Sequence, residues 1–507
     1  MEANVKRGST SLAVKVGFWY VVSTFLAKSL SFITTPLFSR MMSESDYGEF
    51  MNFASWLTTL FIVTSLEMFN TLPRAYYDYT DEFDQYNSSV TIASCGLAVI
   101  FYGLFLISGE WIYEIVSIPI HYIHILFVVL MFQAGKQIYL ARERTMYRYK
   151  SVVCISLINL IIPTVIAVIL VGLLPVEYRL SGRIYGTYVP IILINLFCVL
   201  ILLKKRVIFK IEHLKYAFKL SLPLFVHFFT AYLLISTNVI VTKSVQGAQA
   251  AAVVSIATSV LHILTVLFEA LTGAVTTWVM DNLQQGNGKK LYHDSMFYIS
   301  GLAVVAIGTI LFAPEIVWIL GGAKYASATP LIPFLVVAVF IQAITSLFTV
   351  ILTYEKKIVK TAIFTATVAV ISIVGKIVLM PKYGIDILPT INVVTFGVLF
   401  VLNYILVRKT SHCVAINIKG TVAVIMSTGV LAFFSSILYT YTLMRYIVVG
   451  TIAVVSIFII LKYRKTLLDA VKKVCKRSTC DCRRSSASCI GKRIEKQGIY
   501  SFASRSK

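Results

Sequence analysis

The chain consists of long apolar runs separated by short polar or charged segments. Each run has about the ~20 residues that a helix needs to cross the hydrocarbon core of a membrane, and a segment inside lipid must be helical to satisfy its own backbone hydrogen bonds. The runs are continuous rather than alternating, which excludes a membrane β-barrel. The pattern predicts about fourteen spanning helices, at residues 14–39, 49–71, 88–109, 121–141, 152–173, 185–203, 217–241, 250–280, 295–320, 330–353, 361–380, 386–407, 420–440 and 443–462.

The composition leads to the same class of protein. Of the 507 residues, 58% are hydrophobic and 14% are charged, whereas a soluble domain has roughly 45–50% apolar and about 25% charged residues. A soluble core could not absorb this excess, so the expected fold class is an all-α polytopic membrane protein. The first apolar run, from about Val14 to Ser39, is too long for the apolar part of a secretory signal peptide and is expected to be the first span.

The distribution of Lys and Arg predicts the orientation. The formal net charge is +23, but most of the 46 cationic residues lie in short segments between spans and in the last 46 residues, so topology explains the charge better than nucleic-acid binding does. With the N-terminus in the cytoplasm, 37 of them fall on the inner side, eight on the outer side, and Lys28 in the middle of the first span. This bias predicts that both ends of the chain are cytoplasmic.

The chain is expected to be organised as two halves with an extension. The longest internal connection on the inner side, about residues 204–219, follows the sixth span. The expected parts are an N-terminal transmembrane lobe of spans 1–6 at residues 1–203, a C-terminal lobe of spans 7–12 at 204–410, two additional spans at 411–462, and a basic cytosolic tail at 463–507.

A weak internal repeat is consistent with duplicated lobes, which are common in transporters. Chance similarity between apolar helices explains the repeat about equally well. The matching positions are Ser39-Arg40 with Thr242-Lys243, residues 52–55 with 255–258, and Glu67 with Glu269.

Several short motifs occur in order between residues 15 and 410: PLFSR at 36–40 with DYGEF at 46–50, SLPL at 221–224, GGAKY at 321–325 and PKYGI at 381–385. Together they resemble the O-antigen and capsule unit flippases, polysaccharide-unit flippases of the superfamily that also holds multidrug and toxic-compound exporters. The resemblance implies two six-helix lobes around a central, partly cationic cavity. It also implies that an undecaprenyl-pyrophosphate-linked oligosaccharide crosses from the cytoplasmic to the periplasmic leaflet of a bacterial inner membrane.

The resemblance has further implications and one exception. The implied partners are the lipid-linked glycan, membrane lipids and glycan polymerase machinery in lipopolysaccharide or capsule synthesis. No nucleic-acid partner and no cofactor are expected, and a coupling ion, proton or sodium, is left open. Many relatives carry an acidic–basic pair late in span seven, where this chain has Thr237-Asn238. No role of that pair can therefore be transferred.

Lys28 is the first candidate for the substrate site. A charge at the bilayer centre costs about 2.5 kcal/mol or more, so an ionisable residue there is by default a functional hypothesis. Lys28 is about equally far from both ends of its span, which makes it difficult for the side chain to reach the interface. The hypothesis is that Lys28 binds the diphosphate; the alternative is a structural pairing with Glu67 or Glu269.

Other charged residues complete the predicted site. Arg74 and Lys136 are expected near the inner mouth, and Lys243, with Arg40 and Lys376, on the outer side. They are candidates to bind the anionic substrate, although cations at span ends often anchor the topology by meeting lipid headgroups. Glu67 and Glu269 are candidates for ion coupling or for charge pairing.

Two other functions remain alternatives. An ion-coupled multidrug exporter of the same superfamily would favour anionic cavity residues, whereas the central charge here is Lys28. A membrane glycan polymerase would need reactive groups on sizeable loops, but the predicted outer loops are short and show no nucleophile–base pair, so no enzyme activity is expected. The tail cysteines, at Cys475, Cys480, Cys482 and Cys489, fit no common zinc spacing, and no metal site is expected.

Overall fold

The computed structural model describes residues 33–204, 208–410 and 416–451. Every regular element in these ranges is a helix, which confirms the predicted fold class. The chain divides into two units, residues 16–441 and residues 1–15 with 442–507. Of the second unit, the described residues 442–451 are helical; the rest of the description concerns the first unit.

The first unit begins, where the structure describes it, with a helical segment at residues 33–41. The longer helices follow in the order α2 (Glu44–Ser65), α3 (Leu72–Asp78), α4 (Phe83–Val116), α5 (Ile120–Thr145), α6 (Tyr149–Leu173), α7 (Arg179–Lys204), α8 (Ile211–Gln284), α9 (Gly288–Leu311), α10 (Ala313–Gly321), α11 (Ile332–Tyr354), α12 (Ile358–Tyr383), α13 (Ile387–Thr410) and α14 (Ile418–Thr440). Short 3-10 helices lie between some of them: η1 (Met68–Thr71), η2 (Val176–Tyr178), η3 (Ala323–Leu331) and η4 (Gly384–Asp386).

The predicted spans from the second to the thirteenth all fall on helices. Among the described residues, nine helical stretches have the length and hydropathy to cross a membrane. Two of them, Phe228–Glu269 and Val359–Thr410, each cover parts of two predicted spans, while α2 is not among the nine. The chain is thus a multi-pass membrane protein; spans one and fourteen lie largely outside the described residues.

Three boundaries differ from the prediction, each for a local backbone reason. The expected loop between spans seven and eight is reduced to Gly247, whose φ of 86° interrupts α8 and is accessible to glycine at little cost. Span two ends at Ser65 because Leu66 and Glu67 adopt positive φ. Span nine is split into α9 and α10 near Phe312, just before a proline that cannot continue the backbone ladder.

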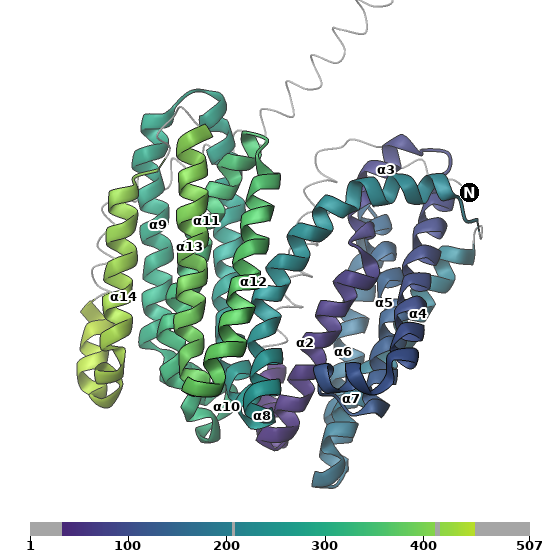
Figure 1. The fold of residues 1–507 in the computed structure, drawn as a ribbon, viewed down its shortest axis with the longest axis horizontal. Coiled ribbons are helices and arrows are strands. Elements are labelled where there is room, and N and C mark those ends of the chain that lie inside the picture. The colour runs from purple at the N-terminus through teal and green to yellow at the C-terminus, as the bar shows by residue number, and fades with distance from the viewer. Residues whose placement is uncertain (1–32, 205–207, 411–415, 452–507) are drawn as a thin grey trace, which may run out of the picture. The chain divides into compact units, whose positions relative to one another are not determined.

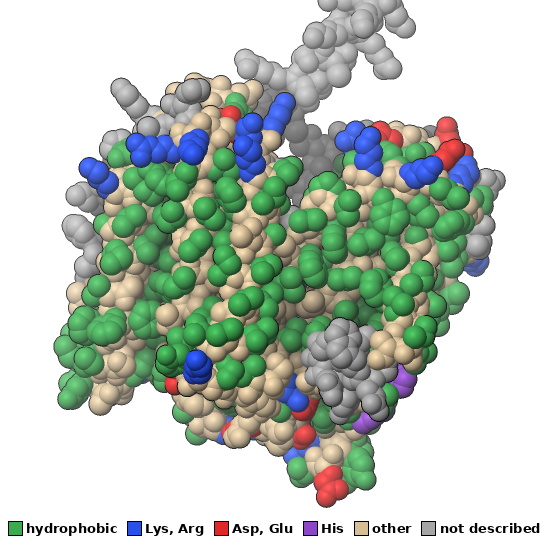
Figure 2. All heavy atoms as spheres, in the orientation of Figure 1, with side chains coloured by type: hydrophobic (Ala, Val, Ile, Leu, Met, Phe, Trp, Pro, Cys, Tyr) green, Lys and Arg blue, Asp and Glu red, His purple; other side chains and the backbone are tan. Residues whose placement is uncertain are grey.

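The outer surface of the helices is apolar, as contact with lipid requires. In α12 the large side chains Val370, Ile371, Val374 and Val378 are each more than half exposed, and they recur at helical spacing on one face. In the view of Figure 2, hydrophobic side chains cover the middle of the face, and Lys and Arg gather along its upper edge.

The long helix α8 connects two groups of helices. It packs against α2 and α4 from the first group, α2 to α7, and against α9, α11 and α12 from the second group, α9 to α14. In Figure 1 it runs, in teal, from the purple and blue helices to the green ones. Any change in the relation between the two groups must therefore act on α8.

Candidate functional site

The PLFSR motif at residues 36–40 meets the end of α10, where the GGAKY motif begins, at one end of the helices. Ser39 donates a hydrogen bond from Oγ to the carbonyl oxygen of Leu320 at 2.6 Å, and Arg40 donates to the carbonyls of Trp318 and Ile319 at 3.2 Å. These carbonyls belong to the last turn of α10. A helix C-terminus leaves carbonyl oxygens for outside donors and favours cations, which explains why a Ser-Arg pair is suited to this position.

A second contact ties the GGAKY motif to the start of α2. Lys324 Nζ donates to the carbonyl oxygen of Met42 at 2.7 Å. The rings of Tyr325 and Tyr47 meet edge to face with centroids 6.0 Å apart, and both side chains are almost completely buried. Aromatic pairs of this geometry add about 1 kcal/mol to the burial of their surface.

The approach of α2 to α8 at the same end depends on a glycine. A Cβ atom added to Gly48 would lie 1.8 Å from the carbonyl oxygen of Ala248, a distance at which the two backbones could not remain in place. The absence of a side chain at Gly48 therefore permits the two helices to touch, as small residues do in membrane helix packing.

Polar side chains flank this helix contact. Lys243 Nζ lies 2.6 Å from Glu49 Oε1, and the two side chains are only 15% and 22% exposed. Gln249 donates to Glu44 at 2.6 Å. We call the contacts of residues 39–49 with residues 243–249 and 318–325 the motif junction, because three of the motifs that carry the family resemblance lie in it. The charge bias predicts that it lies at the outer ends of the helices.

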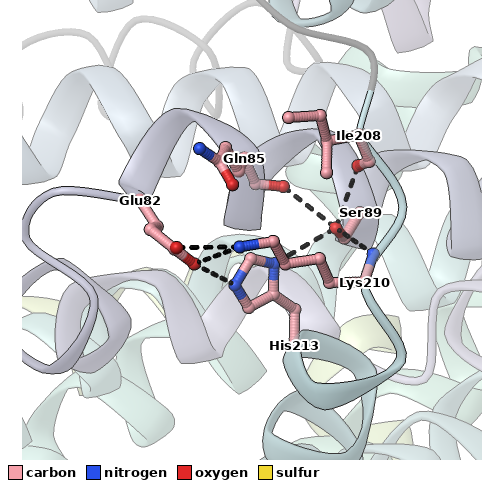
Figure 3. Close-up of polar contacts among 6 residues, drawn as sticks. All are labelled: Glu82, Gln85, Ser89, Ile208, Lys210 and His213. Carbon is pink, nitrogen blue, oxygen red and sulfur yellow. Dashed lines mark hydrogen bonds and ion pairs between the residues drawn. The ribbon is translucent and has the colours of Figure 1, made fainter.

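A polar network lies at the other end, where α4 begins and the segment before α8 passes over it (Figure 3). The Glu82 carboxylate accepts hydrogen bonds from Lys210 Nζ at 2.7 and 2.8 Å, and His213 Nε2 lies 3.2 Å from it. Ser89 Oγ contacts the backbone of Ile208 and Lys210 and lies 3.2 Å from His213 Nδ1. The Lys210 ammonium holds the pKa of Glu82 below its usual value. We call this set the linker network.

The predicted cationic residues that the structure describes lie on different helices. Arg74 is at the surface in α3, with Nε 3.4 Å from Asp78 Oδ2. Lys136 is half-buried within α5, a helix that packs against α7. Lys243 belongs to the motif junction, and Lys28 lies outside the described residues. The structure thus places Arg74, Lys136 and Lys243 in three separate settings.

The two predicted acidic residues occupy different settings. Glu67 is 5% exposed, sits at the break between α2 and η1, and accepts a hydrogen bond from Asn70 Nδ2 at 2.7 Å. Glu269 is exposed in the second part of α8. Among the described residues, no group of three or more His, Cys, Asp and Glu side chains could hold a metal ion.

Lys376, expected on the outer side of the membrane, is buried among the helices. Its side chain in α12 is 0% exposed, and Nζ lies 3.0 Å from Thr237 Oγ1 and 3.4 Å from the carbonyl oxygen of Leu234 in α8. Thr237 is one of the two residues that replace the acidic–basic pair of many relatives. The signal that could have identified a buried position is helical spacing, because Ser372 and Lys376 lie on the side of α12 opposite the exposed valines.

A polar pocket adjoins this lysine contact. It lies between α8, α11 and α13 and has room for water molecules rather than for a larger ligand. Its walls are mainly apolar and carry a small number of amide, hydroxyl and imidazole groups, which are groups that can hold water. The polar lining residues are Asn238, Thr258, His262, Thr265, Gln342 and Asn392.

Known structures share this fold. The chain aligns with the lipid II flippase MurJ in an inward closed conformation with a TM-score of 0.64 and 15% identity, over 88% of this chain and 99% of that one. It aligns with an inward-facing multidrug resistance MATE family transporter of the MOP superfamily with a TM-score of 0.55 and 16% identity, over 75% and 94% of the two chains. At these identities the likeness is one of fold.

The sequence comparisons give the family. No curated protein matches the chain. The family model described as "Polysaccharide biosynthesis protein" matches residues 13–284, which is more than half of the 507 residues and includes the first motifs, the linker network and all of α8. The predicted resemblance is thereby confirmed, and the chain belongs to the polysaccharide biosynthesis protein family.

Proposed function

We propose that the protein is a flippase that moves an undecaprenyl-pyrophosphate-linked oligosaccharide, an O-antigen or capsule unit, from the cytoplasmic to the periplasmic leaflet of a bacterial inner membrane. The observation that carries this proposal is the motif junction. Three of the motifs meet there. Hydrogen bonds join residues 39–49 to the second helix group, and an ion pair and a glycine contact join them to α8. A gate in an alternating-access cycle needs such a contact, strong when closed and made of separable parts.

The other end supports the same mechanism by its different construction. The linker network attaches the residues just before and at the start of α8 to α4 of the first helix group, so it holds α8 without joining the two groups directly. In the proposed cycle the substrate enters at this end, and opening of the motif junction then gives access to the opposite leaflet. The long polyprenyl tail of the substrate remains in the lipid bilayer.

The roles of the predicted residues remain part of the proposal. Lys28 is assigned to the diphosphate, with Arg74 and Lys136 on the entry side and Lys243 at the gate. Lys suits a phosphate as a compact point charge. Glu67 and Glu269 are assigned to ion coupling or to neutralising a lysine. No covalent step and no cofactor are needed, since moving a polar headgroup requires a wet cavity rather than a reaction.

The lipid II flippase with the same fold supports a lipid-linked substrate for this chain as well. The test is reconstitution in liposomes with undecaprenyl-pyrophosphate oligosaccharide, comparing the wild type with Lys28→Ala. We expect glycan crossing that depends on the protein and falls at least tenfold in the variant. Lys382→Ala, an exposed lysine of α12, is the matched control and should transport normally.

Two outcomes would redirect the proposal. If the folded protein moves none of a range of lipid-linked glycans, the exporter and the polymerase become the better candidates. If crossing occurs but Lys28→Ala transports as the wild type does, the flippase assignment stands and the diphosphate role of Lys28 is wrong.

A further inference from the structure

The position of Lys376 within α12 shows that it faces protein rather than lipid. Val370, Val374 and Val378 are exposed at intervals of four residues, whereas Ser372, Lys376 and Met380 are at most 1% exposed at the same interval. The apolar valine face of α12 is therefore exposed, and the face that carries Ser372 and Lys376 is buried. This is the reverse of a surface helix in a soluble protein. Lys376 therefore cannot reach the membrane interface along the lipid-facing side of its helix.

The contacts of Lys376 leave an ammonium group incompletely satisfied. A protonated lysine has three N–H donors and no acceptor, but the oxygens within reach are the Thr237 hydroxyl and the Leu234 carbonyl. The hydroxyl donates its own hydrogen to the carbonyl of Leu233, which leaves a lone pair directed to the lysine. Neutral oxygens stabilise a buried charge far less than a carboxylate does, and an unpaired buried charge is costly.

No acidic side chain offsets this charge in the described part of the chain. None of the ion pairs found there includes Lys376, and α11 carries no charged residue between Ile332 and Tyr354. The titratable groups nearest along the elements that pack on α12 are Tyr232, Lys243 and His262 in α8, Tyr404 in α13, Asp386 in η4, and Lys382 and Tyr383 in α12 itself. Lys243 is paired with Glu49, and Asp386 is exposed.

Two connections link this lysine to the motif junction. Thr237 precedes Lys243 by six residues in α8, about 9 Å along the helix. Gln246 Nε2 also donates to the carbonyl oxygen of Met380 at 2.7 Å, one turn beyond Lys376 on the same face of α12. Next to Thr237, Asn238 lies 3.5 Å from Asn392. Both asparagines line the polar pocket, through which water can approach Lys376.

We propose that Lys376 is a proton-binding site whose occupancy sets the state of the motif junction. The amine is neutral in the closed arrangement described here, where the Thr237 and Leu234 oxygens are its partners. When α8 and α12 separate and water enters from the pocket, the nitrogen takes up a proton from a hydronium ion, so that one N–H bond forms as one O–H bond breaks and a water molecule is released; on closure the proton returns to water. The proton site rests on the proposed transport function, because a bound proton matters only if it biases an alternating-access cycle.

The test measures the junction itself and needs no transported substrate. Spin labels are placed at Ser45 and Ser327, two exposed serines beside the junction, in full-length protein without its eight native cysteines. Pulsed electron paramagnetic resonance gives the distance distribution between pH 6 and pH 10 in lipid nanodiscs. We expect two populations in the wild type, the longer distance increasing as the pH falls.

The variants separate Lys376 from other titrating groups. Lys376→Met is neutral and of similar volume, so it should keep the short distance at every pH. Lys376→Arg retains its charge and should favour the long distance at every pH, while Lys382→Met in the same helix should titrate as the wild type does. A wild type that does not respond to pH, or a Lys376→Met protein that responds fully, overturns the proposal.

A second variant tests the proton site if Lys376→Arg does not fold. If Lys376→Arg does not fold, Thr237→Val removes the hydroxyl partner and should move the midpoint of the wild-type transition by at least one pH unit; an unchanged midpoint counts against the site. Failure of liposome transport with an intact pH response would contradict the flippase proposal alone, and transport without the response would contradict only the proton site.

Discussion

The motif junction and the linker network are both polar, yet they are built for different purposes. At the junction, side chains reach main-chain carbonyls of a distant helix, an ion pair is mostly sheltered, and two backbones touch at Gly48. In the linker network the Glu82 and Lys210 side chains are 42% and 37% exposed, and their contacts stay with α4 and the start of α8. The first arrangement joins two helix groups, whereas the second fixes one connection to one group.

This difference predicts where a substitution will matter. Loss of a contact at the junction should change both stability and the relation between the helix groups. Loss of a contact in the linker network should affect only the attachment of α8 to α4, in a partly exposed setting where ion pairs contribute little.

The largest effect is expected for Gly48→Ala. Its Cβ would meet the Ala248 carbonyl at 1.8 Å, so α2 and α8 must separate, at a cost of about 3 kcal/mol. Thermal unfolding in detergent should show a clear fall in Tm, and the Ser45–Ser327 distance should lengthen.

The control variant for Gly48→Ala is expected to lose no stability. Gly96 in α4 has no atom within 4 Å of an added Cβ, so Gly96→Ala should be neutral or stabilise by up to about 1 kcal/mol through helix propensity. Equal losses of Tm in the two variants would mean that the Gly48 contact does not hold the junction together.

A smaller effect is expected from the Lys243–Glu49 pair. Both side chains are mainly sheltered, between the exposed pairs that contribute under about 1 kcal/mol and the buried pairs whose breakage costs about 3–5 kcal/mol. We expect Glu49→Gln and Lys243→Met each to destabilise by about 1–3 kcal/mol. In the double variant the two losses should not add, because one interaction is removed twice; additive losses would show that the two residues act independently.

The helices were predictable because each span must be apolar over its whole length. Predicted spans two to thirteen rest on that requirement, and all lie on helices. The exceptions have local causes that hydropathy does not register. Gly247 reduces an expected loop to one residue, and positive φ at Leu66 and Glu67 ends α2 early.

The sites were less predictable because they depend on contacts between distant helices. Lys243 was identified as an outer cation, but its partner Glu49 follows only from the approach of α2 to α8. The position of Lys376 near the outer end of an apolar run predicts an outer residue. Helical spacing alone would have placed it opposite Val374 and Val378, inside the protein, so in this case the information was present in the sequence.

The smallest effect is expected in the linker network and depends on pH. Lys210 lowers the pKa of Glu82 from the ordinary 4.5, so the folded state favours the carboxylate. The stabilisation is therefore present above pH 4.5 and is lost as the pH falls through the lower folded pKa. Glu82→Gln should lower Tm only slightly at pH 7, because exposed ion pairs contribute little, and its Tm should fall less than that of the wild type on acidification.

Asp81→Asn is the matched control for Glu82→Gln, because Asp81 is an exposed neighbouring carboxylate. Tm measured from pH 7 down to pH 3 should fall in this variant as it does in the wild type. The Ser45–Ser327 distance should be unchanged in both variants, since neither touches the motif junction. A lengthened distance in Glu82→Gln would show that the linker network acts on the motif junction through α8. The linker network and the motif junction would then be coupled rather than independent.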